Sequence, residues 1–420
     1  MKEWSPAIAQ NLVMFEAPDA NIQTGMMSLK RLNLTDFRCY DFARLEVDSR
    51  PIVLTGPNGA GKTNVLEAVS FLAPGRGLRA ARLGEVSRRY GAQHLVSEAR
   101  SPRAWAVAAQ LAWDDATVDI GTGLEPTTEE TGRERRIIKI DGETGKSQTD
   151  LGLLTSALWL TPQMDRLFLE GASGRRRFVD RLILGLHPDH GGPVSAYDHS
   201  MRSRNKLLKE GCRDGEWLDS VEDSMARHGI AVAVRRLETV HRLREMATGD
   251  DGPFPGAELE MQGQLESWLD DMSALDAEDR FREALSAQRK SDRGTGVTSI
   301  GPHRSDLLVY HRKHGERASQ CSTGEQKALL IRIILAAAQL QTRERGRPPL
   351  LLLDEVAAHL DAKRRASLFD IICGLRIQAW MTGTDNVMFQ TLGGRAQFFD
   401  ISAARIEKIS VAHTAFYNSI

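Results

Sequence analysis

The stretch Gly56-Pro57-Asn58-Gly59-Ala60-Gly61-Lys62-Thr63 decides the fold of this chain. It matches Gly-x-x-x-x-Gly-Lys-Thr, the pattern of a phosphate-binding P-loop. The apolar run 51–55 predicts a strand before it, and the following pattern predicts a helix from Lys62 through Phe71. Glycines let backbone N–H groups face phosphate oxygens, the Lys62 ammonium reaches the β- and γ-phosphates, and the Thr63 hydroxyl ligates Mg²⁺. We therefore expect an α/β fold that binds ATP and Mg²⁺.

A second apolar segment predicts the other half of this site. The run 350–353 consists of four leucines and is followed by Asp354 and Glu355. A run of this kind is typical of a fully buried parallel strand. An acidic residue at its carboxyl end can hold Mg²⁺ partly through water, which is the role expected for Asp354. We expect Glu355 to act as the catalytic base that polarises the attacking water, with Lys62 as the other catalytic residue.

A polar segment precedes the next predicted helix, which runs from Glu325 to Thr342. Its residues Ser322 and Gly324 can form an anion-binding helix N-terminus. The alternative is an ordinary capping box, in which Ser322 and Glu325 satisfy each other's backbone groups. The sequence in isolation leaves both interpretations open.

Composition limits the classes of protein that remain. The chain has 420 residues, 41% of them hydrophobic, and a formal net charge of −1. These values exclude a disordered or collagen-like chain, and any nucleic-acid site must be a local basic patch. Four cysteines far apart in the sequence indicate reduced thiols in a cytoplasm, and no apolar stretch is long enough for a membrane span. His311 and His314 lack a third ligand nearby in sequence, so they do not predict a metal site.

The pattern along the chain predicts three parts. Residues 1–25 read as an N-terminal extension, and residues 26–165 together with 293–420 as one α/β domain. Residues 166–292 show few strand signals and a heptad-like apolar spacing, which predicts an inserted helical domain. Within the α/β domain we expect turns at 121–123 and 141–142, and strands at 297–300 and 306–310.

The densest group of basic residues lies in the predicted insertion. Several Lys and Arg on one face would neutralise a DNA backbone without reading its sequence. The alternative interpretation is a solvated helix face. The residues concerned are Arg175, Arg176, Arg177, Arg181, Arg202, Arg204, Lys206 and Lys209.

In combination, these motifs resemble the ABC-type ATPase heads. In that class the segment at Ser322 and Gly324 is the signature motif, which closes over the ATP held by the P-loop of a second head. The resemblance therefore implies an ATP-dependent homodimer. It places Asp361 in the D-loop. At the switch position this chain has Thr382 where transporters have His, which is closer to DNA-repair ATPases.

The match narrows to the RecF family. The blocks 29–40, 75–79, 159–163, 174–180 and 301–306 are similar to blocks of that family and occur in the same order. The interval between Lys62 and Ser322 is too short for the long coiled coil of chromosome-maintenance proteins. We therefore expect a P-loop ABC-type head built from N- and C-terminal lobes, with a helical insertion. By analogous placement, the resemblance also puts Arg38 and Gln163 at the nucleotide and Arg79 near ATP or DNA.

The resemblance further implies the biological role. It is ATP-dependent DNA binding in recombinational repair, in which the dimer binds single- and double-stranded DNA at gaps or junctions. It would help RecO and RecR load RecA, with links to replication restart and the SOS response. Slow, DNA-dependent ATP hydrolysis would act as a switch. The alternatives are an ABC transporter ATPase, which needs a membrane partner, and a nuclease-associated P-loop ATPase, which needs a further carboxylate cluster.

Overall fold

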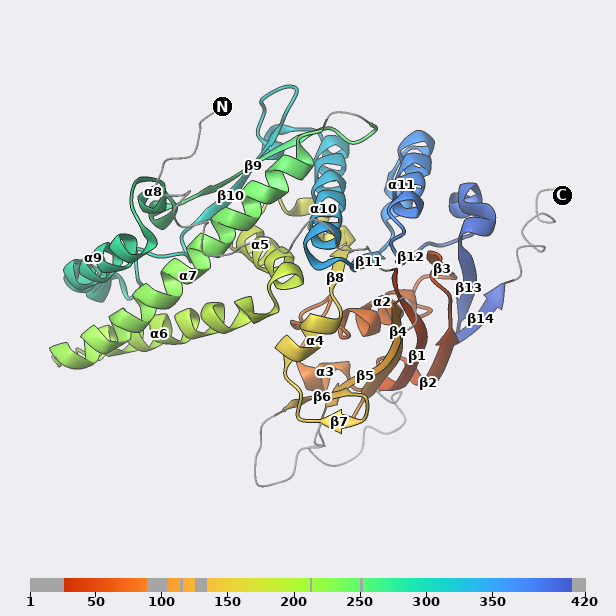
Figure 1. Cartoon of the computed structure of the whole chain (residues 1–420), viewed down its shortest axis with the longest axis horizontal. Coiled ribbons are helices and arrows are strands. Elements are labelled where there is room, and N and C mark those ends of the chain that lie inside the picture. Colours follow the sequence, from red (N-terminus) through yellow and green to blue (C-terminus); the bar gives the residue numbers. More distant parts are fainter. Residues whose placement is uncertain are drawn as a thin grey trace. The chain divides into compact units, whose positions relative to one another are not determined.

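The computed structural model describes residues 26–88, 104–113, 116–124, 134–211, 214–249 and 252–409. The chain divides into two compact units (Figure 1). The first unit holds the described residues of 26–164 and 341–409, and the second unit is 165–340. The expected insertion at 166–292 thus ends earlier than the second unit does, and its boundaries stay a prediction. The expected extension, residues 1–25, lies outside the described residues.

The P-loop strand lies inside a six-stranded sheet of the first unit, in the order β14-β13-β3-β12-β11-β8. The strand β3 pairs in parallel with β12 on one side and β13 on the other, so both of its neighbours come from the C-terminal part of the chain. Every residue of β3, β8, β11 and β12 is buried, as expected for parallel strands covered on both faces. The strands are β3 (Ile52–Thr55), β8 (Ala157–Leu160), β11 (Leu350–Leu353), β12 (Ala379–Thr382), β13 (Gln397–Ser402) and β14 (Arg405–Ile409).

A second, antiparallel sheet of the first unit has the order β2-β1-β4-β5-β6-β7. Phe37 and Phe71 contact Trp105 at centroid distances of 5.5 and 5.1 Å, in a hydrophobic core shared by residues of both sheets. The strands are β1 (Met27–Phe37), β2 (Tyr40–Glu46), β4 (Ala106–Trp113), β5 (Ala116–Leu124), β6 (Arg136–Ile140) and β7 (Glu143–Thr144). The helical segments of this unit are α2 (Lys62–Ser70), α3 (Leu83–Val86), α4 (Gln148–Leu154), η5 (Val356–His359), α11 (Ala362–Gly374) and η6 (Val387–Arg395).

The two predicted turns of this sheet have different outcomes. The turn at 141–142 is confirmed, because Asp141 and Gly142 have positive φ and join β6 to β7. The turn at 121–123 is wrong, because those residues lie inside β5. A Cβ on Gly123 would stand 2.3 Å from the carbonyl oxygen of Trp105. Glycine is there to let two strands approach closely, not to turn the chain.

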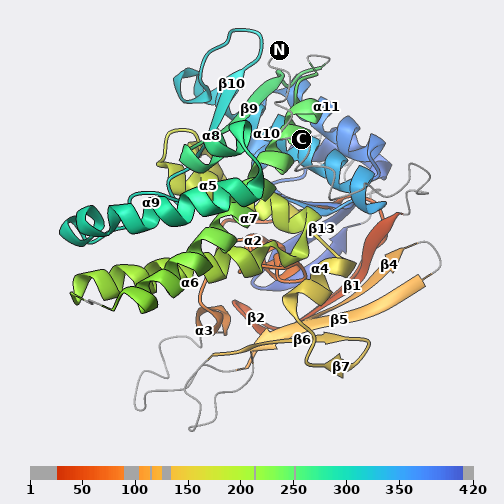
Figure 2. The ribbon, with the colours of Figure 1, turned by 60° about the vertical axis from the view of Figure 1, so that its left-hand side comes forward.

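The second unit is mainly helical. Its helices α6, α7 and α9 run side by side (Figure 2), and β9 pairs with β10 as a two-stranded antiparallel ribbon. The strand β9 was not expected, and the predicted strand at 297–300 is wrong, because these residues form a loop. The elements are α5 (Ala172–Leu186), η3 (Pro188–His190), α6 (Gly191–Lys209), α7 (Gly215–Ala247), β9 (Ala257–Gln262), α8 (Gln264–Asp271), α9 (Ala274–Thr295), β10 (Asp306–His311) and η4 (Ala318–Gln320). Two further elements cross between the units: η2 (Pro162–Arg166) and α10 (Thr323–Arg345).

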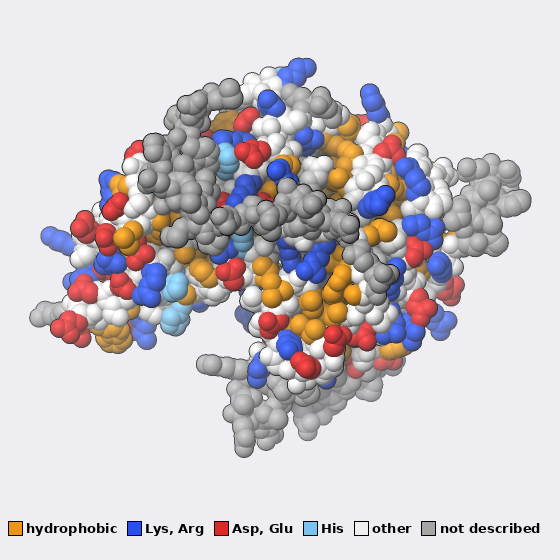
Figure 3. Space-filling view, viewed as in Figure 1, with side chains coloured by type: hydrophobic (Ala, Val, Ile, Leu, Met, Phe, Trp, Pro, Cys, Tyr) orange, Lys and Arg blue, Asp and Glu red, His pale blue; other side chains and the backbone are white. Residues whose placement is uncertain are grey.

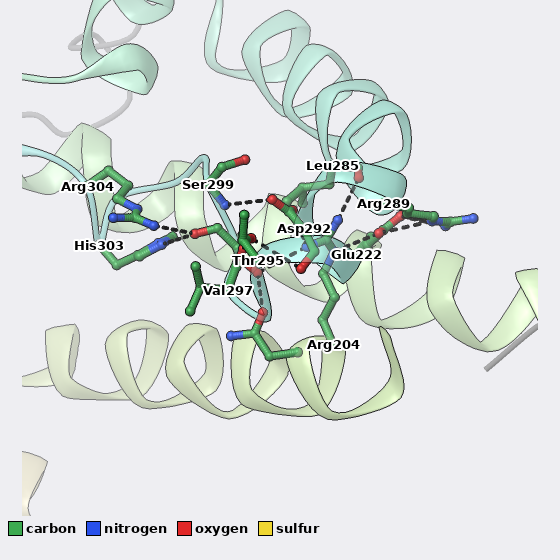
Figure 4. Close-up of polar contacts among 12 residues, drawn as sticks. Arg204, Glu222, Leu285, Arg289, Asp292, Thr295, Val297, Ser299, His303 and Arg304 are labelled. Carbon is green, nitrogen blue, oxygen red and sulfur yellow. Dashed lines mark hydrogen bonds and ion pairs between the residues drawn. The ribbon is translucent and has the colours of Figure 1, made fainter. Parts of the chain in front are cut away.

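A buried ionic cluster joins the three long helices of the second unit (Figure 4). The side chain of Arg204 in α6 is fully buried and donates to Glu222 of α7 and Asp292 of α9, each at 2.7 Å. It also donates to the hydroxyl of Thr298 at 3.0 Å. Ser299 N–H donates to Asp292 at 3.1 Å. The 297–300 segment is therefore held by polar contacts to helices, which explains why it does not form a strand.

Candidate nucleotide-binding site

The P-loop leaves β3 in a backbone conformation that only glycine adopts easily. Gly56 has φ of 138°, and a Cβ on it would lie 2.1 Å from the carbonyl oxygen of Ile401 in β13. Gly61 has φ of 114°, and its Cβ would lie 2.7 Å from the hydroxyl of Tyr40. Burial raises the pKa of Tyr40, so its hydroxyl stays protonated and donates to the Gly61 carbonyl at 3.1 Å. The neighbouring strands thus fix the path of the loop.

Lys62 lies at the start of α2 with its ammonium on the loop. The side chain is buried, and Nζ donates to the carbonyls of Gly56 at 2.6 Å and Pro57 at 2.9 Å. No side chain caps the N-terminus of α2. The first N–H groups of that helix and the ammonium therefore converge where an anion can bind, because phosphate oxygens can replace the loop carbonyls.

Three polar side chains meet at the carboxyl edge of the parallel sheet. The hydroxyls of Thr63 and Thr382 both donate to Oδ1 of Asp354, at 3.0 and 2.8 Å. They come from α2, from the end of β12 and from the residue after β11. The predicted Mg²⁺ ligands Thr63 and Asp354 are thus in direct contact. Their hard oxygen donors suit Mg²⁺, which Thr63 would hold through its hydroxyl oxygen and Asp354 partly through water.

Glu355 follows directly and has an unusual backbone. Its φ of 53° lies in the left-handed region, and its N–H donates to the hydroxyl of Thr382 at 2.9 Å. Within the described part of the chain its carboxylate makes no hydrogen bond or ion pair, so it can accept one from a water. A non-glycine residue in this conformation is strained, and such strain is concentrated at functional sites.

Beside the P-loop, two arginines converge on a single carboxylate. Glu67, one helical turn after Thr63, is fully buried. It accepts from Arg38 Nε at 2.8 Å and Nη2 at 2.5 Å, and from Arg79 Nη1 at 3.1 Å. Arg79 also donates to Asn64 at 3.0 Å. The sequence indicated Arg38 and Arg79 but missed Glu67, because nothing local in the sequence marks a buried partner of two distant arginines.

Two other predicted nucleotide contacts, Gln163 and Asp361, form no hydrogen bond with a P-loop residue within the described part of the chain. Gln163 is exposed in η2, three residues after the buried end of the edge strand β8. Asp361 caps α11 and accepts from the N–H of Arg364 at 2.8 Å. Both assignments stay predictions.

The predicted signature residues Ser322 and Gly324 lie in the second unit, exposed at the start of α10. Ser322 and Glu325 form the capping box: the Ser322 hydroxyl donates to Glu325 Oε2 at 2.7 Å, and its N–H donates there at 2.9 Å. The cap interpretation is therefore confirmed. It leaves the anion-binding interpretation open, because an exposed cap can also face a ligand.

Several arginines proposed for DNA have internal partners instead. Arg175 forms a two-point ion pair with Asp306 at 2.7 and 2.8 Å, and Arg176 donates to the carbonyl of Ser305 at 2.7 Å. Arg204 is fully buried. Burial lowers the pKa of Arg181 to about 9. Arg175, Arg176 and Arg204 therefore stabilise the second unit.

The candidates that remain exposed are Arg177, Arg202, Lys206 and Lys209. Basic and acidic side chains are interspersed on the visible face of the second unit (Figure 3). A basic DNA-binding surface on the second unit would therefore depend on these four side chains. Among the residues that the structure describes, no helix has the length and apolar character needed to cross a membrane.

Comparison with known proteins gives consistent results. The family described as RecF/RecN/SMC N terminal domain matches residues 28–405. The chain is 47% identical over 382 residues to a protein of Rhizobium johnstonii named "DNA replication and repair protein RecF", covering 90% of this chain and 98% of that one. A protein of the same name from Agrobacterium fabrum is 47% identical over 383 residues, covering 91% and 98%.

Solved structures are similar in fold. The recombination mediator protein RecF-ATPrS in the RecFOR pathway has a TM-score of 0.77 at 20% identity, with 93% of this chain and 100% of that chain covered. The Smc head domain of Pyrococcus furiosus has a TM-score of 0.50 at 15% identity, with 93% and 98% covered. These likenesses confirm the expected α/β P-loop ABC-type ATPase head with a helical insertion, and no long coiled coil is evident among the described residues.

Proposed function

The chain belongs to the RecF family, and from that premise we propose that it is an ATP-dependent DNA-binding ATPase of recombinational DNA repair. The observation that carries the proposal is the contact of Thr63 and Thr382 with one oxygen of Asp354, beside the P-loop. Thr63 and Asp354 would hold Mg²⁺ there, and its charge would reduce the repulsion between the phosphates of ATP. ATP would bind at residues 56–63.

Hydrolysis would depend on Glu355. Its carboxylate follows Asp354 in the chain and, among the described residues, has no partner that would neutralise it. A base at this place would orient a water towards the γ-phosphate. The reaction would be slow and DNA-dependent, because its purpose is to end a DNA-bound state and not to make a product.

ATP would also join two copies of the chain. Ser322 and Gly324 are exposed at the N-terminus of α10, and a helix N-terminus attracts phosphate. In the proposed homodimer, these residues of one copy cover the γ-phosphate held by the P-loop of the other. Asp361, Gln163 and Arg38 are the further nucleotide contacts that we propose.

The dimer would bind DNA at gaps or junctions and help RecO and RecR load RecA, with links to replication restart and the SOS response. The names of the relatives support a role in DNA repair, and we propose that the protein acts in the cytoplasm. A transporter ATPase is less well supported, because Thr382 stands at the switch position. A nuclease-associated ATPase needs another carboxylate cluster, and the only group of three metal-binding side chains in the described ranges is His311, His314 and Glu325.

The test is DNA binding by the Glu355→Gln variant. We expect at least about a 100-fold loss of ATP hydrolysis, because a general base is removed. ATP-bound dimers should accumulate by light scattering, and they should hold gapped duplex more tightly than blunt duplex or single strands across a salt series. Glu283→Gln, an exposed change in α9, is the matched control and should behave as the unchanged protein.

Two outcomes would contradict the proposal. One is ATP-independent affinity for all three DNA substrates in both variants. The other is an ATP-bound Glu355→Gln protein that remains monomeric, because the proposed site needs residues from two copies.

A further inference from the structure

Three metal-binding side chains meet in the second unit, away from the P-loop residues in the sequence. His311 ends β10, His314 lies in the following turn, and Glu325 lies in the first turn of α10. One ligand atom from each residue lies within 4.8 Å of the other two. The centroids of the two imidazole rings are 4.5 Å apart.

Backbone hydrogen bonds fix the turn that brings the histidines together. The N–H of His311 donates to the Glu316 carbonyl at 2.8 Å, and the N–H of Gly315 donates to the His311 carbonyl at 2.8 Å. Gly315 has φ of 68°, which the tight turn requires and glycine provides. The backbone positions of the two histidines are therefore fixed by main-chain hydrogen bonds.

His311 has an unsatisfied polar atom. Its side chain is 5% exposed, and its Nδ1 is buried with no hydrogen-bond partner. An unpaired buried polar atom is costly, so native proteins rarely keep one without a purpose. A bound cation is one such purpose, because an imidazole nitrogen without a proton is a metal ligand.

Glu325 would supply the negative charge. Its carboxylate accepts hydrogen bonds from the hydroxyl and from the N–H of Ser322. Both bonds from Ser322 reach Oε2. Oε1 is therefore available to a metal while Oε2 continues to cap the helix.

We propose that His311, His314 and Glu325 form a binding site for a divalent transition metal of the zinc type. Two imidazoles and one carboxylate are a known ligand set for Zn²⁺, with a water in the fourth position. Ligand atoms bonded at about 2.1 Å to one tetrahedral ion lie about 3.4 Å apart. Closing from 4.8 Å requires only side-chain rotation, which is open to His314 because it is exposed.

The metal site would connect the turn after β10 to the N-terminus of α10, where Ser322 and Gly324 lie. Glu325 is three residues after Ser322 and bonded to it, so the metal would fix the residue that is proposed to meet ATP. This goes beyond the proposed function, because metal binding needs neither ATP nor DNA. Metal binding would make the segment around Ser322 more ordered.

The experiment is calorimetric titration of ZnCl₂ into the full chain after treatment with EDTA and a reductant. We expect one tight equivalent, weakened at least about 100-fold in His314→Ala and in Glu325→Gln. Glu325→Gln keeps a side-chain oxygen for the cap. His199→Ala, an exposed change in α6, is the matched control and should retain the tight equivalent.

The chain also has free thiols at Cys39, Cys321 and Cys373, which can bind zinc. Co²⁺ distinguishes these sites, because thiolate ligands add intense near-ultraviolet charge-transfer bands that imidazole and carboxylate do not give. Visible bands without the thiolate bands, lost in His314→Ala, are the expected result. Absence of a tight equivalent, thiolate bands, or equal affinity in His314→Ala would each overturn the proposal. The proposed ATPase function would stand in every one of those cases.

Discussion

The two units of the molecule differ in how each arranges a cluster of arginine and carboxylate side chains. In the second unit an arginine is central: the side chain of Arg204 has 0% exposure, and its partners Glu222 and Asp292 have 1% each. In the first unit a carboxylate is central: Glu67 has 1% exposure, but its partners Arg38 and Arg79 have 18% and 38%. The charges of Arg204, Glu222 and Asp292 are all internal, whereas in the first unit the buried Glu67 anchors arginines that are partly exposed.

The difference separates structural arginines from arginines that can bind a ligand. Arg204 donates to four groups, so its hydrogen-bonding capacity serves the fold. Glu67 orients both Arg38 and Arg79. Arg79 is 38% exposed beside the P-loop, whereas Arg38 is 18% exposed and also donates to the Glu85 carbonyl at 2.7 Å. Because a buried carboxylate holds them in place, binding a phosphate there would cost little side-chain entropy.

The largest expected effect is on Arg204. Arg204→Met should lower the free energy of unfolding by about 3–5 kcal/mol, because it leaves buried Asp292 without its ion-pair partner and buried Glu222 with Arg289 as its remaining one. Chemical denaturation measures this. Arg202→Met, an exposed change two residues away, should stay within about 0.5 kcal/mol. Equal effects of the two substitutions would remove the contrast between buried and exposed arginines.

An intermediate, pH-dependent effect is expected at Asp180. Burial alone would raise the pKa of this carboxyl, but hydrogen bonds from His190 and Arg236 outweigh burial and lower it. A folded-state pKa below the unfolded value of about 3.9 stabilises the protein above that pH, and the stabilisation is lost as the pH falls through the folded-state value. Asp180→Asn should therefore lower the free energy of unfolding by about 2 kcal/mol at pH 7 and by little in acid.

Denaturation at several pH values tests this prediction. The control is Asp189→Asn, whose carboxylate pairs with Arg235 but is mostly exposed. It should change stability by less than about 0.5 kcal/mol at every pH. A loss in Asp180→Asn that is the same at pH 3 and pH 7 would show that the charge of Asp180 contributes nothing.

The smallest effect on stability, but a clear one on binding, is expected at Arg79. Arg79→Ala should change the free energy of unfolding by less than about 1 kcal/mol, because its ion pair is partly exposed. ATP affinity should fall about tenfold if the side chain contacts phosphate, which corresponds to about 1.4 kcal/mol. Unchanged ATP affinity in equilibrium titration would show that Arg79 forms an ion pair with Glu67 and does not contact phosphate.

The sequence predicted the strand and helix that flank residues 56–63 and the buried strand at 350–353. Residues 56–63 and the strand 350–353 carry local signals, a glycine pattern and a continuous apolar run. Glu67 and Thr382 carry no such signal: their contacts join residues distant in sequence, such as Arg38 with Glu67 and Thr382 with Asp354. Pairs of this kind become visible only when the chain is folded.

The two wrong assignments in the fold have the same cause. The glycines at 121 and 123 read as a turn, but the carbonyl of Trp105, the residue before the neighbouring strand β4, requires glycine at 123. The run 297–300 reads as a strand, but its Thr298 hydroxyl is bound by Arg204 of α6. The strand β9 differs, because its six residues alternate between apolar and polar and thus carry a local strand signal that was missed. In the two wrong assignments, by contrast, a distant partner overrides the local pattern.

The position of β3 has a consequence for how the protein is made. Ile52 pairs with Trp380 on one side and with Gln397 on the other, so a ribosome has produced nearly the whole chain before this strand can form its ladders. Until then an apolar segment waits without hydrogen-bond partners, a state that favours aggregation and chaperone binding. A message truncated before codon 380 would therefore yield a product that contains the glycine motif but cannot build the sheet that shapes it.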